Sequence, residues 1–483
     1  MINRYPPNAT QLRNECILEI KNRVSGSWPF WLAIGFISIV FLFGGGARRD
    51  ILTLPLVRAA AALTCAASMF TIEVRHLRRH RIALVCVIAI AALIALHLIP
   101  LPPTLWILLP GREFVQANDR LAHLGAVWRP LTLAPGETWN SLYSLLVPLA
   151  VLLCGIQLEL GQLRRLILAI VAIGIVSGLI GIMQVIGDTR GPLYFYRITN
   201  VGSAVGLFSN RNHHAIFLAT LFPMISWLAG RRTANFERAR IRSWLCALAS
   251  VILVPIILVA GSRAGLILGI LGILGAWRLY RPVAAGRAAR RGPSRFDLRA
   301  PFVALAMLLM GVMTFLVSRA DAVSRLTDNG EQGELRLKFW GPILALGWKY
   351  FPVGAGIGSF VEVYRMGEPD KLLDPSYLNH AHNELLEIWL TAGIPGLVVA
   401  LPVAIVLTVA SVAALRGSAL AKPAGDLRAL GGLTVLILLL GSIADYPLRT
   451  PSLAALMVVA ILWLCAPTDE LTGKPLEKGQ AFV

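Results

Sequence analysis

The stretch LILAIVAIGIVSGLIGIMQVI, residues 166–186, contains no charged side chain over 21 positions. An α-helix needs about 20 predominantly apolar residues to cross the hydrocarbon core of a bilayer. The stretch is therefore long enough and apolar enough to cross a membrane. It predicts a transmembrane helix in the second quarter of the chain.

Similar apolar segments recur along the whole sequence. Eleven more meet or nearly meet the length of a membrane crossing; they lie near 28–46, 51–70, 82–100, 140–158, 213–229, 244–260, 264–277, 300–317, 384–415, 429–444 and 452–466. The spans at 264–277 and 384–415 have the least certain boundaries, being unusually short and unusually long. The pattern predicts an all-α polytopic membrane protein with about 12 transmembrane helices.

Composition favours the same class. Hydrophobic residues make up 56% of the 483 residues, which is more apolar surface than a soluble protein of this size needs to bury. The net charge of +19 comes from basic residues in short loops between apolar runs, so membrane topology explains it better than nucleic-acid binding does. The six cysteines show neither a disulfide framework nor metal-ligand spacing. The first apolar run follows a basic stretch without a small-residue cleavage site, so we expect a retained helix.

The distribution of Lys and Arg predicts the orientation. Basic loops are retained on the cytoplasmic side of a membrane. An alternating path through the twelve segments puts the N-terminus and the basic stretches 75–81, 231–242 and 278–299 on one side, which we expect to be cytoplasmic. The loops 101–139, 187–212 and 318–383 then lie outside.

These assignments divide the chain into five parts. The expected order is a cytoplasmic N-terminus (1–27), transmembrane helices 1–9 (28–317), a large outer loop (318–383), transmembrane helices 10–12 (384–466) and a cytoplasmic tail (467–483). Arg58, in the second helix, fits this scheme poorly. Its side chain is expected either to extend outward to the membrane surface or to face the interior of the bundle.

The strongest chemical signal is the sequence HAHNELLE, residues 380–387, at the outer end of the tenth helix. His380, His382, Asn383, Glu384 and Glu387 are costly in lipid unless they face water or a site. Histidine titrates near neutral pH and could accept a proton from a hydroxyl group. The alternative is a helix start at the membrane surface, with Asn383 as the cap and the histidines exposed to water.

Three other polar patches fall on the same outer side. Arg263, in the turn GSRAG at 261–265, offers a planar guanidinium suited to phosphate, or it extends to the surface from a helix end. Arg336 begins RLKFW, and the glycines at 354–358 resemble a phosphate-binding loop only weakly. The sequence GLFSNRNHHA at 206–215 enters the sixth helix, with Asn212 as the expected cap.

The turn DYPLR at 445–449 could also border a cavity, but we interpret it as a short connection between helices. The concentration of polar patches on one side favours an outward-facing site. A transporter, in contrast, is expected to bury polar residues along a path near the bilayer midplane.

These blocks together resemble the O-antigen ligase and polysaccharide polymerase family of bacterial envelope proteins. The resemblance covers most of the chain, and its most specific part is His-Asn, then Leu, an apolar turn and Gly-Ile-Pro-Gly; the matching blocks are 98–102, 128–133, 206–223, 262–263, 336–360 and 382–396. Thr391 and Ala392 stand where many relatives have an acidic residue and a Thr or small residue, so no acid is assigned there.

The resemblance implies a metal-independent, cofactor-free glycosyltransferase of the bacterial inner membrane, with a large periplasmic loop and a site that faces the periplasm. Such enzymes move glycan from a polyprenyl diphosphate carrier to a hydroxyl of a glycan or lipid-core acceptor. It implies that Arg263 and Arg336 bind the donor diphosphate and that His382 lies nearest the reaction. His382 would be either the general base or a further phosphate ligand, and direct displacement would invert the anomeric centre.

Second-tier candidates border the expected site by topology alone: Arg211, Asn210, His213, His380, Glu384 and Glu387. Two other functions stay open. One is transfer of oligosaccharide to a protein hydroxyl, which differs only in the acceptor. The other, motivated by the many helices and by Arg58, is a transporter or flippase of lipid-linked glycan. The motifs do not distinguish ligase from polymerase, nor do they give the sugar, the linkage or the oligomeric state.

Overall fold

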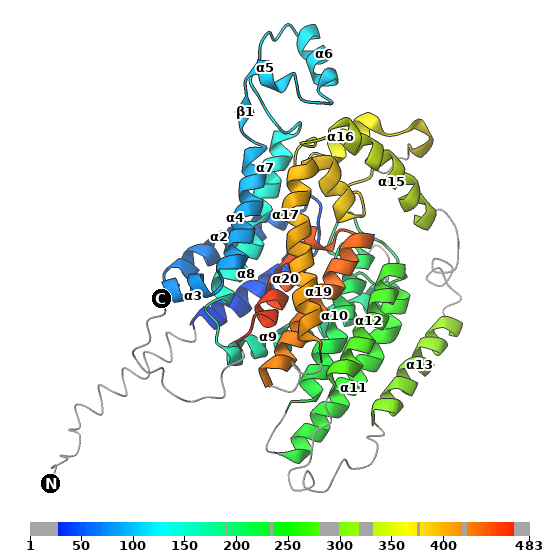
Figure 1. Ribbon diagram of the computed structural model, residues 1–483. Helices are drawn as coiled ribbons and strands as arrows, with labels where there is room; N and C mark the ends of the chain where they lie inside the picture. The colour runs from blue at the N-terminus through cyan, green and yellow to red at the C-terminus, as the bar shows by residue number, and fades with distance from the viewer. Residues whose placement is uncertain are drawn as a thin grey trace, which may run out of the picture.

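The computed structural model describes residues 28–188, 191–231, 235–280, 299–317, 332–373, 377–416 and 423–467, and the chain is mostly helical over these ranges (Figure 1). The first half contains the helix Trp28–Phe43, α2 (Leu54–Met69), α3 (Val74–Arg79), α4 (Arg81–Leu96), β1 (Pro100–Leu101), α5 (Pro103–Trp106), α6 (Glu113–Leu121), β2 (Arg129–Pro130), α7 (Pro135–Ser144), α8 (Leu146–Gly155) and α9 (Leu160–Ile186). The second half contains α10 (Arg211–Ala229), α11 (Phe236–Val259), α12 (Arg263–Leu279), α13 (Arg299–Val317), α15 (Gln332–Lys349), α16 (Phe360–Gly367), η2 (Asp370–Leu372), α17 (Glu384–Ala414), α19 (Pro423–Ala444), η3 (Pro447–Arg449) and α20 (Pro451–Leu464).

Several of these helices can cross a membrane. Within the described residues, five are long and apolar enough: Pro135–Gly155, Leu160–Ile186, Glu237–Val259, Glu384–Ala414 and Asp426–Ala444. Shorter apolar helices accompany them at Trp28–Phe43, Leu54–Met69, Arg81–Leu96 and Pro451–Leu464. The chain is therefore a multi-pass membrane protein. Every apolar segment expected to cross contains helix, while the count of twelve crossings stays a prediction because some helices are short.

Helices α10 and α12 run in the same direction and lie close together. A side chain at Gly265 would come within 2.3 Å of the Ala215 Cβ, and one at Gly272 within 2.4 Å of the Ala219 carbonyl oxygen. Small residues allow two helix backbones to approach closely inside a membrane. The contact of Gly265 with Ala215 joins the first turns of the two helices, and the contact of Gly272 with Ala219 joins residues further along both. The helices α10 and α12 therefore begin at the same end of the bundle.

That end also receives the termini of three other helices. α19 ends there, because Gly441 packs beside Ile216 near the start of α10. α20 begins there, and the Ser452 amide donates a 3.1 Å hydrogen bond to the carbonyl of Gly44, just after the first helix. The start of α17 lies at this end too, with α16, whereas α3 and the start of α11 lie at the opposite end (Figure 1).

The segment 101–139, expected as an outer loop, contains a small folded unit that projects from this end (Figure 1). Strands β1 and β2 pair antiparallel, with Leu101 opposite Arg129. Arg112 is fully buried and donates hydrogen bonds to the carbonyls of Leu131, at 2.7 Å, and Gly354, at 3.4 Å. This guanidinium links the unit to the loop that precedes α16.

The Gly-Ile-Pro-Gly sequence of α17 produces a kink. Gly393 has a φ of 56°, in the left-handed region that glycine adopts without steric cost. At the kink, backbone carbonyl and amide groups of α17 have no partner within the helix, and residues 352–356 form hydrogen bonds with them. Ala355 donates to the Leu390 carbonyl at 3.0 Å, and Ile394 donates to the Pro352 carbonyl at 2.9 Å. These bonds fix the loop that leads into α16 against the first turns of α17.

Replacing Gly393 with alanine should therefore destabilise the protein. A Cβ there would lie 2.1 Å from the Pro352 carbonyl oxygen, and the left-handed backbone alone costs about 1–3 kcal/mol for a residue other than glycine. We expect a lower unfolding midpoint for Gly393→Ala in detergent. Gly35→Ala is the matched control, since a Cβ at Gly35 has nothing within 4 Å. Equal midpoints for the two variants would contradict this account of the kink.

Candidate active site

His382 faces a buried carboxylate. It lies just before the Asn383 cap of α17 and has a φ of 50°, which few residues other than glycine adopt. Its Nδ1 is 3.2 Å from Oδ1 of Asp445, the residue that follows α19. Asp445 is fully buried, and the side-chain amide of Asn212 donates a hydrogen bond to its other oxygen. The two helix ends thus meet through a His–Asp pair.

The charge of Asp445 determines the tautomer of His382. Burial opposes ionisation of Asp445, but attraction to His382 and hydrogen bonds to its oxygens outweigh burial and keep the pKa of Asp445 well below its usual range. An ionised carboxylate can only accept hydrogen bonds. His382 Nδ1 must therefore carry a proton, and in the neutral ring Nε2 is left able to accept one.

Tyr446 lies among three imidazoles. Its ring centroid is 4.4 Å from that of His380 and 4.9 Å from those of both His382 and His213. His213 is fully buried, with its Nδ1 2.8 Å from the Thr450 hydroxyl and its Nε2 3.7 Å from Asp445 Oδ1. The turn after α19 therefore organises all three histidines.

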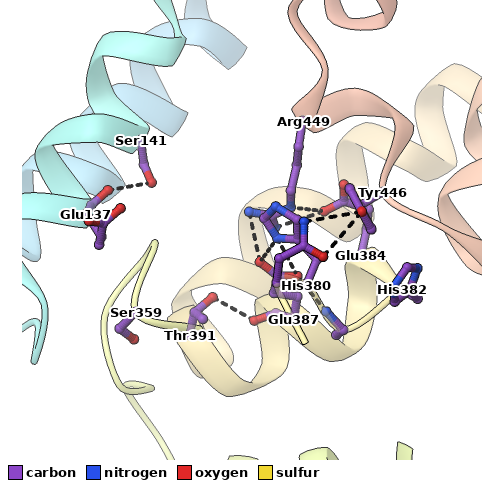
Figure 2. A network of polar contacts seen from close by, with 12 residues as sticks. Glu137, Ser141, Ser359, His380, His382, Glu384, Glu387, Thr391, Tyr446 and Arg449 are labelled. Atoms are coloured by element: carbon purple, nitrogen blue, oxygen red, sulfur yellow. Dashed lines mark hydrogen bonds and ion pairs between the residues drawn. The ribbon is translucent and has the colours of Figure 1, made fainter. Parts of the chain in front are cut away.

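A second histidine–carboxylate pair lies on the other side of Tyr446. His380 Nδ1 is 3.0 Å from Oε1 of Glu387, and the Ala381 amide donates a 3.0 Å hydrogen bond to Oε2. Arg449 Nη1 lies 3.0 Å from the same Glu387 carboxylate. Figure 2 shows His380 and Arg449 converging on Glu387, with His382 separate from them.

Arg449 also pairs with Glu384, one helical turn before Glu387. Its Nε and Nη2 donate to Glu384 Oε2 at 3.1 and 2.9 Å. Burial lowers the pKa of Arg449, but attraction to Glu384 and Glu387 outweighs burial and raises it above the usual value. One guanidinium thus balances two carboxylates at the start of α17.

A cavity of about 200 Å³ adjoins this second pair. Figure 2 shows Glu137 and Ser141 of α7 across from His380 and Glu387. The lining comes from the segment after the first helix, α2, α7, α16 and the loop before it, α17 and the residues before it, η3 and α20: Gly46, Ala47, Arg48, Arg49, Leu54, Arg58, Glu137, Asn140, Ser141, Ser144, Gly358, Phe360, Val361, Glu362, Tyr377, Asn379, His380, Glu387, Leu448, Arg449 and Pro451.

Arg58 contributes to this lining. Of the two orientations expected for it, the structure has the one in which the side chain faces the interior. Its guanidinium donates to the side-chain and backbone oxygens of Asn140. The cavity therefore accounts for a charged residue that fits poorly in an apolar helix.

The structure brings five of the expected residues into one polar cluster: His382, His213, His380, Glu384 and Glu387. Asn210, not Asn212, caps α10, because its side chain accepts a 2.8 Å hydrogen bond from the Asn212 amide. The expected cap was wrong by two residues, since the side chain of Asn212 is committed to Asp445. The Arg211 amide donates to Asn200 at 3.0 Å.

The two expected diphosphate ligands, Arg263 and Arg336, are not among the described side chains that form this cluster. Arg263 is the first residue of α12 and is exposed, and Ser262 caps the helix through a 3.0 Å hydrogen bond from the Gly265 amide. Arg263 is not part of the cavity lining. Arg336 lies in α15, but its side chain lies outside the described side chains. Their role in binding diphosphate stays a prediction.

Sequence reasoning passed over the turn 445–449. We interpreted it as a short connection, and it is short, yet Asp445, Tyr446 and Arg449 make most of the contacts that join the histidines. The available signal was an acidic and a basic residue, Asp445 and Arg449, four positions apart in a turn between apolar helices. Charged side chains at such a place are costly unless they pair or face a site.

Comparison with known proteins gives a match for part of the chain. A family model described as O-antigen ligase matches residues 248–401. Residues 248–401 are therefore similar to the O-antigen ligase family. No curated protein matches the chain.

The match covers only part of the cluster. It contains Arg263, Arg336 and His382, whereas Asp445 and Arg449 lie beyond its end. Within the described part of the chain, no group of three or more His, Cys, Asp or Glu side chains is placed to hold a metal ion. The polar groups that meet at this end of the bundle are therefore basic residues, carboxylates and histidines that pair with one another.

Proposed function

We propose that the chain is a glycosyltransferase that acts at the periplasmic face of the bacterial inner membrane. It moves glycan from a polyprenyl diphosphate carrier to an acceptor hydroxyl, in ligation or polymerisation of a surface polysaccharide. The observation that carries the proposal is the His382–Asp445 pair, located where α10, α17 and α20 begin.

The orientation rests on charge. The basic helix α3 and the start of α11 lie at the end of the bundle opposite the cluster (Figure 1). Basic segments are retained in the cytoplasm. The His382 end of the bundle is then periplasmic, and residues 318–383 belong to a large periplasmic loop.

The proposed reaction is a single displacement. His382 Nε2 accepts the proton of the acceptor hydroxyl while the hydroxyl oxygen forms a bond to the anomeric carbon. The bond from that carbon to the carrier phosphate breaks, and the diphosphate keeps the electron pair. Attack opposite the leaving group inverts the anomeric centre. Arg263 and Arg336 stabilise the charge that grows on the diphosphate, which is the main electrostatic task and needs no metal.

A transfer assay tests the reaction. Purified protein, radiolabelled polyprenyl diphosphate oligosaccharide and a chelator of divalent metals should give a larger labelled product. A ladder of products would indicate polymerisation, and a single step onto added acceptor would indicate ligation. Removal of one group that stabilises transition-state charge costs about 10²–10³ in rate, so Arg263→Ala and Arg336→Ala should each fall in that range.

Other outcomes of the assay point to the alternatives. Label on protein would indicate a protein O-oligosaccharyltransferase. If no label moves with any acceptor or metal, while lipid-linked glycan crosses vesicles that contain the protein, the transferase proposal fails and a flippase replaces it. Full activity of both arginine variants would overturn their assignment to the diphosphate.

A further inference from the structure

The cavity beside His380 is distinct from the immediate surroundings of His382. His380 lines it, and the ring of Tyr446 lies between His380 and His382, with centroid distances of 4.4 and 4.9 Å. A group in the cavity would therefore be one aromatic ring away from the proposed base. It would be close enough to belong to the same substrate molecule without being the reacting atom.

The charges of the cavity are balanced within the protein. Arg49 lies between Glu137 and Glu362, with its Nη1 2.8 Å from Glu362 Oε1. Arg449 pairs with Glu384 and Glu387. The lining contains three carboxylates, of Glu137, Glu362 and Glu387, and four guanidinium groups, of Arg48, Arg49, Arg58 and Arg449, so these charges largely offset one another. The cavity favours an uncharged polar ligand.

Two polar residues of the lining indicate what kind of ligand the cavity suits. The Arg58 guanidinium can only donate hydrogen bonds, and Glu362, as an ionised carboxylate, can only accept them. A hydroxyl group donates and accepts, so a ligand with several hydroxyls can pair with both side chains. Ser141 and Ser144 of α7 add further hydroxyls to the same lining.

Size limits how much of a glycan the cavity can hold. Its volume of about 200 Å³ lies below the roughly 300–1,000 Å³ of pockets for drug-sized ligands. The cavity suits one ring rather than a whole oligosaccharide. Phe360, Leu448 and Pro451 supply apolar surface for the C–H face of such a ring.

We propose that this cavity is a saccharide subsite that holds one sugar ring of the glycan substrate through its hydroxyl groups. Glu362 and Arg58 are the specificity-determining residues. The proposal rests on the proposed function for its substrate class, but it makes a separate claim about binding.

Binding to the full chain in lipid nanodiscs tests the proposal without catalysis. The probes are the free oligosaccharide released by mild acid from the lipid-linked donor of the source cells and, separately, inorganic pyrophosphate. Ser144→Trp places an indole in the cavity and should weaken oligosaccharide binding at least about 10-fold. Glu362→Gln keeps the shape but loses a charged acceptor, and hydrogen bonds to charged groups imply a loss of about 10-fold or more.

Gly136→Trp is the control, since it adds an indole to the same helix at a position with nothing within 4 Å of its Cβ. Its oligosaccharide affinity should stay within about twofold of wild type. Pyrophosphate binding should be unchanged in all three variants. No oligosaccharide binding by wild type, or equal binding in both cavity variants, would overturn the subsite. A joint loss of pyrophosphate and oligosaccharide binding would make the cavity a phosphate site instead.

These readouts separate the two proposals. If the transfer assay fails while oligosaccharide binding depends on Ser144 and Glu362, the saccharide subsite is supported and the proposed transfer reaction is contradicted. If transfer succeeds and neither cavity variant changes oligosaccharide binding, the proposed transfer reaction is supported and the saccharide subsite is contradicted.

Discussion

His382→Ala is expected to lower the rate of glycan transfer by about 10²–10⁴-fold, the range for loss of a general base. The reason is that Asp445 accepts from Nδ1 and leaves Nε2 free to take the hydroxyl proton. The side chain of His382 is partly exposed, so its removal leaves no buried cavity and the protein should stay folded in the membrane. The measurement is the initial rate of transfer from radiolabelled lipid-linked donor, at equal amounts of purified protein.

The variant Asp445→Asn tests whether His382 acts as a general base or as a phosphate ligand. Asparagine keeps the shape but no longer requires the proton to be on His382 Nδ1, so rate should fall even though His382 is present. If His382 only holds phosphate, the donor KM should rise in His382→Ala with kcat nearly unchanged. Unchanged kcat and KM in His382→Ala would remove His382 from the site altogether.

Arg449→Met is expected to lower the free energy of unfolding by about 3–5 kcal/mol, the cost of removing one partner from a buried ion pair. Methionine fills most of the space, but Glu384 and Glu387 lose the cation that both contact. Glu387 is 1% exposed, so its carboxylate stays poorly solvated once the guanidinium is gone. The measurement is the unfolding midpoint in detergent, together with the yield of monodisperse protein from membranes.

Two further variants make this prediction specific. Arg449→Met combined with Glu384→Gln should recover part of the stability, because one of the unpaired charges is gone. Arg75→Met is the surface control, since the Arg75–Glu73 pair is exposed and such pairs contribute about 0–1 kcal/mol. If Arg449→Met unfolds no more easily than Arg75→Met, the ion pairs at the start of α17 do not stabilise the fold.

Much of the fold could be predicted because lipid imposes a simple rule on sequence. A helix satisfies every backbone hydrogen bond internally, so apolar runs of sufficient length become helices whatever their neighbours are. Each expected apolar segment accordingly contains helix. The alternative interpretation of residues 380–387 had Asn383 as a helix cap, and Asn383 does cap α17; capping depends on residues only two or three positions apart, here the amides of Leu385 and Leu386.

Pairings across the sequence were beyond prediction. His382 and Asp445 are 63 positions apart, and His213 and Asp445 are 232 apart. Local pattern does not say which turn faces which, so the turn at Asp445 was interpreted as a plain connection. The cap of α10 was wrong for the same reason, because a distant carboxylate engages Asn212.

The sequence by itself determined a multi-pass helical membrane protein, a resemblance to one family, and a histidine-rich segment at one end of a helix. Hydrophobicity and helix capping depend on residues close together in the sequence, so both can be predicted from a single sequence. Only the tertiary structure decided that Asp445 orients His382, that Arg449 balances two glutamates, and that Arg58 and Glu362 meet at a cavity. These are contacts between distant segments, set by how the helices pack and by where the kink at Gly393 directs the loop.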